Sequence, residues 1–99
     1  MPIWKLTPTD LNAVQWQVSK YDGEVVIRTE SDERARELVG YCCWKSGQSS
    51  DANIAGPPWN NPNVVTVSQC NEADFASTGS GEGVLSPPEV VELWKEFND

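Results

Sequence analysis

The sequence predicts an α+β domain: a small antiparallel or mixed sheet of about four strands with two helices packed on one face. Two observations carry this prediction. Short alternations of apolar and polar residues occupy residues 3–29, and two longer segments with helical spacing begin near residues 31 and 86. A chain of 99 residues has the length of one domain with one hydrophobic core, so residues 1–99 are expected to fold as a single domain.

Three strands are expected before the first helix. The segment IWKLT at Ile3–Thr7 alternates and is followed by Pro8, which ends it. The segment VQWQVS at Val14–Ser19 places two valines and a tryptophan on one side and polar residues on the other. The dipeptide Asp22-Gly23 is a strong turn signal, so Val14–Ser19 is expected to form a hairpin with EVVIRT at Glu24–Thr29.

The segment RTESDERARELVGYCCWK, Arg28 to Lys45, predicts the first helix. Ser31 or Thr29 can cap its N-terminus, and Gly47 is a plausible stop at the other end. One apolar stripe at helical spacing should face the core. Its members are Ala35, Leu38, Val39, Cys42 and Cys43.

The second half alternates between loops and regular structure. Residues 47–63 are rich in Gly, Pro, Ser and Asn and predict a long loop, whereas VVTVSQC at Val64–Cys70 predicts a strand. The connection from Thr29 through the helix could make the strands at its two ends parallel, with another strand between or beside them. Residues 71–86 are expected to be a flexible acidic loop.

A capping box predicts the second helix. Ser86 should be the N-cap, Pro87 the first helical residue and Glu89 the reciprocal partner. The apolar face of this helix should pack on the sheet. It comprises Val90, Leu93, Trp94 and Phe97.

The charge is strongly acidic and unevenly spread. The chain holds 15 acidic and 7 basic residues, which gives a net charge of −8, and residues 72–99 hold seven acidic residues and one basic residue, a net −6. This balance argues against direct binding to nucleic acid or to an anionic membrane, and it permits a basic partner. We therefore expect a protein partner with a basic surface. The oligomeric state does not follow from the sequence.

Composition also bounds the location and the chemistry. No apolar run is long enough to span a membrane, the N-terminus lacks a secretory pattern, and three cysteines, two of them adjacent, suit a reducing cytoplasm. The chain contains no histidine, which removes the commonest general base and metal ligand. The adjacent cysteines do not have the spacing of a zinc site. No cofactor or metal, and no enzymatic activity, is expected.

The candidate binding residues lie opposite the stripe of the first helix. Arg34, Glu37, Tyr41 and Trp44 share that side. In one interpretation the helix frays and Trp44 turns under the long loop against Trp59; in the other, the aromatic residues form an exposed patch of the kind that dominates binding interfaces. We favour burial of Trp44, because large aromatic residues are more often buried, and leave Tyr41 open.

Two further groups are candidates. Trp59, in the rigid stretch GPPWNNPN, is either a recognition anchor or a plug that holds the long loop on the core, and we favour the plug. Glu89, Glu92 and Glu96 have near-helical spacing, so they form either a solvated helix face or a contact for a basic surface.

Three segments resemble a group of small hypothetical bacterial proteins. They are WKLTPTDL at Trp4–Leu11, VVIRTESDERARELV at Val25–Val39 and PPW at Pro57–Trp59. Members of the group resemble W-K-L-T-P-x-D-L, then V-x-V-R-A-x-x-E-x-x-A-R, then P-W before a final strand. The group has no established activity, so the resemblance implies a soluble, stand-alone bacterial domain. This chain departs from it in a longer 71–86 segment and in the second helix.

Three classes of function follow as hypotheses. The first is a non-enzymatic module whose protein partner docks on an aromatic patch, the long loop or the acidic C-terminal region. The second is a nucleic-acid mimic that occupies the basic groove of a nucleic-acid-binding complex, such as a phage-type inhibitor of a defence system. The third is a small carboxylate-dependent enzyme, which the absence of histidine makes the least favoured.

Overall fold

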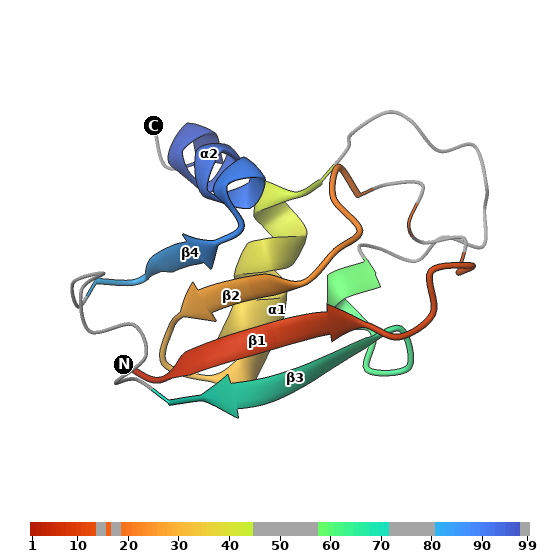
Figure 1. Ribbon diagram of the computed structural model, residues 1–99, viewed down its shortest axis with the longest axis horizontal. Coiled ribbons are helices and arrows are strands. Elements are labelled where there is room, and N and C mark those ends of the chain that lie inside the picture. The colour runs from red at the N-terminus through yellow and green to blue at the C-terminus, as the bar shows by residue number, and fades with distance from the viewer. Residues whose placement is uncertain (14–15, 17–18, 45–57, 72–80, 98–99) are drawn as a thin grey trace.

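The computed structural model describes residues 1–13, 16, 19–44, 58–71 and 81–97. These residues form a four-stranded antiparallel sheet with two helices packed against it, which confirms the predicted α+β class (Figure 1). The strands are β1 (Ile3–Pro8), β2 (Val25–Arg28), β3 (Val65–Cys70) and β4 (Gly83–Ser86), and the helices are α1 (Asp32–Cys42) and α2 (Pro88–Phe97). A 3-10 turn covers Pro58–Asn60.

The strand order is β3-β1-β2-β4, which places β1 inside the sheet. Leu6 of β1 lies opposite Val25 of β2 on one side and Val67 of β3 on the other, and both pairings are antiparallel. As a result β2 and β3 run parallel to each other with β1 between them, as the connection through the first helix suggested. The chain thus passes from β2 through α1 to the far edge of the sheet.

The hairpin predicted from Val14–Ser19 is wrong. Strand β2 is already flanked by β1 and β4, so it has no free edge for that partner. Within the predicted strand, Trp16 lies in a helical turn, and Ser19 makes an isolated bridge to Trp44. Residues 14–15 and 17–18 lie outside the described residues. Alternation of apolar and polar residues does not by itself make a strand, because pairing with neighbouring strands determines which segments form strands.

The segment that completes the sheet is β4, within the predicted loop. Residues Gly83–Ser86 pair antiparallel with β2, with Val84 opposite Ile27 and an irregularity in the register between Val26 and Ile27. The loop predicted for residues 71–86 is therefore wrong over 83–86, while residues 72–80 lie outside the described residues. Two apolar residues between glycine and serine are too short a signal to predict a strand.

Helix ends differ from the expected positions by one to a few residues. Ser31 is the N-cap of α1, and its hydroxyl accepts a hydrogen bond of 3.1 Å from the Arg34 amide. Helix α1 ends at Cys42, and Gly47, the expected stop, lies outside the described residues. Helix α2 starts at Pro88, so the predicted Ser86 cap is wrong, because Ser86 belongs to β4.

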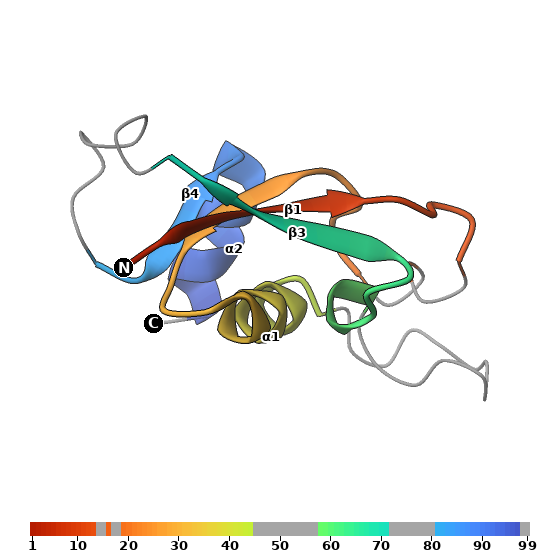
Figure 2. The ribbon, with the colours of Figure 1, turned by 90° about the horizontal axis from the view of Figure 1, so that it is seen from below.

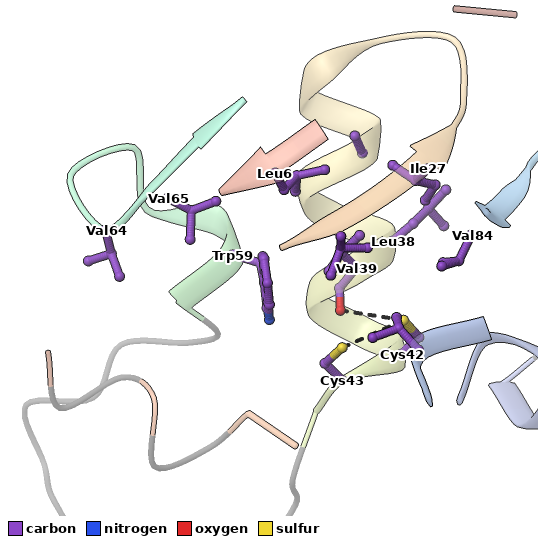
Figure 3. Packing of buried hydrophobic residues seen from close by; sticks show 13 residues of the cluster. Leu6, Ile27, Leu38, Val39, Cys42, Cys43, Trp59, Val64, Val65 and Val84 are labelled. Carbon is purple, nitrogen blue, oxygen red and sulfur yellow. Dashed lines mark hydrogen bonds between the residues drawn. The ribbon is translucent and has the colours of Figure 1, made fainter. Parts of the chain in front are cut away.

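The core lies between the sheet and the helices. Helix α1 crosses beneath the sheet, and α2 packs on β4 and against α1 (Figure 2). The five residues of the predicted α1 stripe are all buried and belong to one cluster with Leu6, Val25 and Ile27 of the sheet. Figure 3 shows Leu38 and Val39 of this stripe on the side of α1 that faces Leu6 and Ile27. Val90 of α2 and Trp59 of the 3-10 turn complete this core.

Candidate functional site

The side of α1 opposite the core carries two exposed aromatic residues. Tyr41 is 54% exposed and Trp44, just beyond the helix end, is 39% exposed. The expected burial of Trp44 is therefore wrong, and Tyr41, which the sequence left open, is exposed as well.

Tyr41 does not stand alone, because its ring stacks on a ring from the other helix. The Tyr41 and Phe97 ring centroids are 6.3 Å apart, with 15° between the ring planes. Trp94 lies beside Phe97 at 6.0 Å and 40°. Tyr41 is in the last turn of α1 and Phe97 ends α2. We call Tyr41, Trp94 and Phe97 the helix-end aromatic surface.

The exposure of Phe97 corrects the prediction that it faces the core. Along α2 the stripe is progressively uncovered: Val90 is fully buried, Leu93 and Trp94 are half-buried, and Phe97 is 48% exposed. Helical spacing predicted a common buried face for these residues, but the packing of α2 on β4 and α1 buries only its first part. Phe97 is the functional candidate that sequence reasoning missed, although its aromatic character beside acidic residues was a possible signal.

Gly83 of β4 makes room for Trp94. A Cβ atom at Gly83 would lie 2.9 Å from Trp94 Nε1, closer than side chains normally approach. The missing side chain lets the indole lie against the strand. Trp94 in turn contacts Phe97, so this close approach helps to set the position of the helix-end aromatic surface.

Acidic residues are neighbours in the sequence of the residues that form the helix-end aromatic surface. Glu37 lies one turn before Tyr41, and the exposed Glu96 precedes Phe97. The nearby cation Arg34 lies 3.9 Å from Glu37 and 3.7 Å from Glu82. Together α1 and α2 contain six acidic and three basic residues, a net −3. The surroundings therefore favour a positively charged partner group.

The three glutamates of α2 remain in solvent. Glu89, Glu92 and Glu96 are all exposed, and Glu92 lies 3.4 Å from Lys95. This is an exposed ion pair of small energetic weight, so it leaves the face accessible. The structure therefore groups these residues on α2 and separates them from Trp59.

Trp59 is a plug in the core and offers no binding surface. It is fully buried and makes an edge-to-face contact with Trp16 at 5.2 Å. Its Nε1 donates to Ser19 Oγ at 3.0 Å, and its carbonyl accepts from Arg36 at 3.2 Å. These contacts fix the 3-10 turn to α1, which agrees with the favoured interpretation of this residue.

The adjacent thiols fill space at the end of α1 (Figure 3). The Sγ atoms of Cys42 and Cys43 are 4.0 Å apart, and both residues are buried. The hydrogen bond with Cys42, together with burial, raises the pKa of the Cys43 thiol and keeps it neutral. Within the described part of the chain, no group of three or more Cys, Asp or Glu residues gathers to hold a metal.

The outer face of the sheet has a shallow hollow that the sequence did not predict. Its volume is about 430 Å³, and Lys5, Glu24, Val26, Ser68 and Cys70 contribute to its lining. Lys5, Val26, Ser68 and Cys70 lie on three neighbouring strands and Glu24 directly precedes β2, so their grouping depends on a register that the sequence alone does not give.

Comparison with protein-family models, curated proteins and solved structures finds no match to this chain. Among the described residues, neither helix has the length and apolarity required to cross a bilayer.

Proposed function

We propose that this chain is a non-enzymatic protein-binding module that holds a basic segment of a partner on its helix-end aromatic surface. The observation that carries the proposal is the stack of Tyr41 on Phe97. Both rings are about half exposed, yet they are stacked on each other, and the Phe97 ring also lies against Trp94. Aromatic side chains held in place at a surface lose little entropy on binding and supply large contact areas.

The acidic surroundings define the chemistry of the partner. Aromatic faces attract Lys and Arg side chains, and Glu37 and Glu96 add negative potential beside Tyr41 and Phe97. The net charge of −8 would speed the approach of a basic protein. The favoured ligand is thus a peptide segment with Arg or Lys next to an apolar side chain.

Selection from a displayed library of short random peptides tests this function. We expect the enriched peptides to combine Arg or Lys with an apolar neighbour, and Tyr41→Ala or Phe97→Ala to weaken their binding by roughly tenfold or more. Leu11→Ala is the matched control, because Leu11 is 57% exposed and lies in a turn after β1. Enrichment of peptides that bind both helix-end variants as tightly as the unaltered chain would refute the proposal.

A nucleic-acid mimic is the second candidate, and the exposed carboxylates of α2 favour it. Glu89, Glu92 and Glu96 are accessible and could contact a basic groove. Nucleic-acid mimicry predicts that the affinity for the partner falls steeply between low and moderate salt. It also predicts that replacing all three glutamates by Lys abolishes binding. Binding through the helix-end aromatic surface also predicts some loss of affinity with salt, but the apolar contact should keep binding measurable at moderate salt, and Phe97→Ala should have a large effect.

A further inference from the structure

Strand β3 is a free edge of the sheet without the usual protection. In the order β3-β1-β2-β4 it has one neighbour, and no other described element lies beyond it in either view (Figures 1 and 2). Residues Val65–Cys70 contain no charged residue and no proline, and their six pairs with β1 show no register shift. Natural edge strands usually carry charged residues, prolines or bulges, which prevent pairing with another chain.

The alternation of hydrogen-bonded residues along β3 shows which of its main-chain groups face away from β1. Thr9 N–H donates to the Val64 carbonyl at 2.8 Å, so alternate residues from Val64 onward, including Thr66 and Ser68, bond to β1. The N–H and C=O of Val67 and Gln69 therefore point away from the sheet. The Val65 N–H also points outward, but it donates to the Asn61 carbonyl at 3.0 Å.

We propose that β3 pairs antiparallel with β3 of a second copy about a two-fold axis at Ser68. In this register Val67 lies opposite Gln69 of the second copy and Gln69 lies opposite its Val67. The outward N–H and C=O groups of these residues then form four intermolecular hydrogen bonds. The two sheets become one continuous eight-stranded sheet, and each copy contributes the same surface.

The distribution of charge along the chain favours a second copy as the partner of this edge. Residues 52–71 contain no Asp, Glu, Lys or Arg in a chain of net charge −8, so β3 is where two copies can meet without opposed like charges. Ser68 faces Ser68, and Thr66 faces Cys70 of the second copy. The nearest cations, Lys5 of each copy, are separated by three strand spacings, about 14 Å, which exceeds the Debye length at physiological salt.

A disulfide tests the register directly. In a Cys70→Ser background, Ser68→Cys places two thiols across the axis, where Cα atoms about 4.5 Å apart suit a disulfide. Thr66→Cys in the same background is the control, since its two copies lie about 14 Å apart along the strands. We expect rapid covalent dimers for Ser68→Cys and none for Thr66→Cys; equal crosslinking of the two would overturn the register.

Sedimentation equilibrium tests the association itself. We expect a monomer–dimer equilibrium that Ser68→Lys weakens by roughly tenfold or more, because it sets two cations opposite each other. Asn63→Lys adds the same charge outside β3 and should have little effect. Added salt should strengthen the dimer by screening the acidic charge of both copies. A chain that stays monomeric at high concentration and salt, or that forms open-ended aggregates, would overturn the proposal.

Discussion

At the scale of single residues, Trp59 anchors the 3-10 turn Pro58–Asn60 to the core. Its indole is buried against Trp16, and both its ring nitrogen and its carbonyl are hydrogen-bonded to other segments. Trp44 is the contrasting case, since it is exposed and no ring contact joins it to another described aromatic residue. The two tryptophans therefore differ in their contribution to stability.

Replacement of Trp59 should be costly. Trp59→Ala should lower the free energy of unfolding by about 3–5 kcal/mol, because it leaves a large cavity and removes the hydrogen bond from Trp59 Nε1 to Ser19 Oγ. Trp44→Ala should change it by less than about 0.5 kcal/mol. Urea unfolding followed by circular dichroism measures both, and equal losses for the two variants would contradict the assignment of Trp59 as the plug.

The Cys43 thiol should make stability depend on pH in the alkaline range. Its pKa is raised in the folded chain, whereas the unfolded thiol loses its proton near its ordinary pKa of 9.0. The folded state then holds more protons, so the free energy of unfolding should fall above about pH 9, by up to about 1.4 kcal/mol per pH unit. Cys43→Ala should remove this part of the slope, and an unchanged alkaline slope in that variant would contradict it.

At this scale the sequence predicted burial well but exposure poorly. The stripe from Ala35 to Cys43 and the plug role of Trp59 follow from helical spacing and from the need to hold a long loop. The exposure of Trp44 and Phe97 depends on the tertiary packing around the ends of α1 and α2. Tertiary packing is not a local property, so residue type gave the wrong expectation for Trp44 and helical spacing gave the wrong expectation for Phe97.

At the scale of elements, β4 connects the sheet to the candidate site. It pairs with β2, and its first residue, Gly83, accepts the close approach of Trp94 from α2. The sequence missed β4 because its apolar signal is two residues long, and it placed a strand at Val14–Ser19 because alternation there is stronger. Strand choice depended on which segment could reach the free side of β2, which local pattern does not encode.

A methyl group at Gly83 tests this connection. Gly83→Ala should displace Trp94 and lower the free energy of unfolding by about 1–3 kcal/mol through overpacking. Gly81→Ala is the matched control, because no atom lies within 4 Å of its Cβ position, and it should be near neutral. Thermal unfolding distinguishes them, and equal melting temperatures would show that the Trp94 contact does not constrain the strand.

At the scale of the whole molecule, charge separates two surfaces. The helix-end aromatic surface is bordered by acidic residues, whereas the free edge at β3 belongs to an uncharged stretch. The proposed dimer leaves the helix-end aromatic surface of each copy uncovered, because α2 packs on β4 at the opposite edge of the sheet. Two such surfaces in one assembly would bind a partner with repeated basic segments more tightly than either surface alone.

The measurement that tests the proposed function most directly is a double-mutant cycle on Tyr41 and Phe97, with a selected basic peptide and isothermal titration calorimetry. If the stacked rings form one binding surface, each Ala variant loses roughly tenfold or more in affinity, and the double variant loses less than the sum, with a coupling of about 0.5–1.5 kcal/mol. Unchanged affinity in all three variants, with binding abolished by Lys at Glu89, Glu92 and Glu96, would contradict it and favour the nucleic-acid mimic.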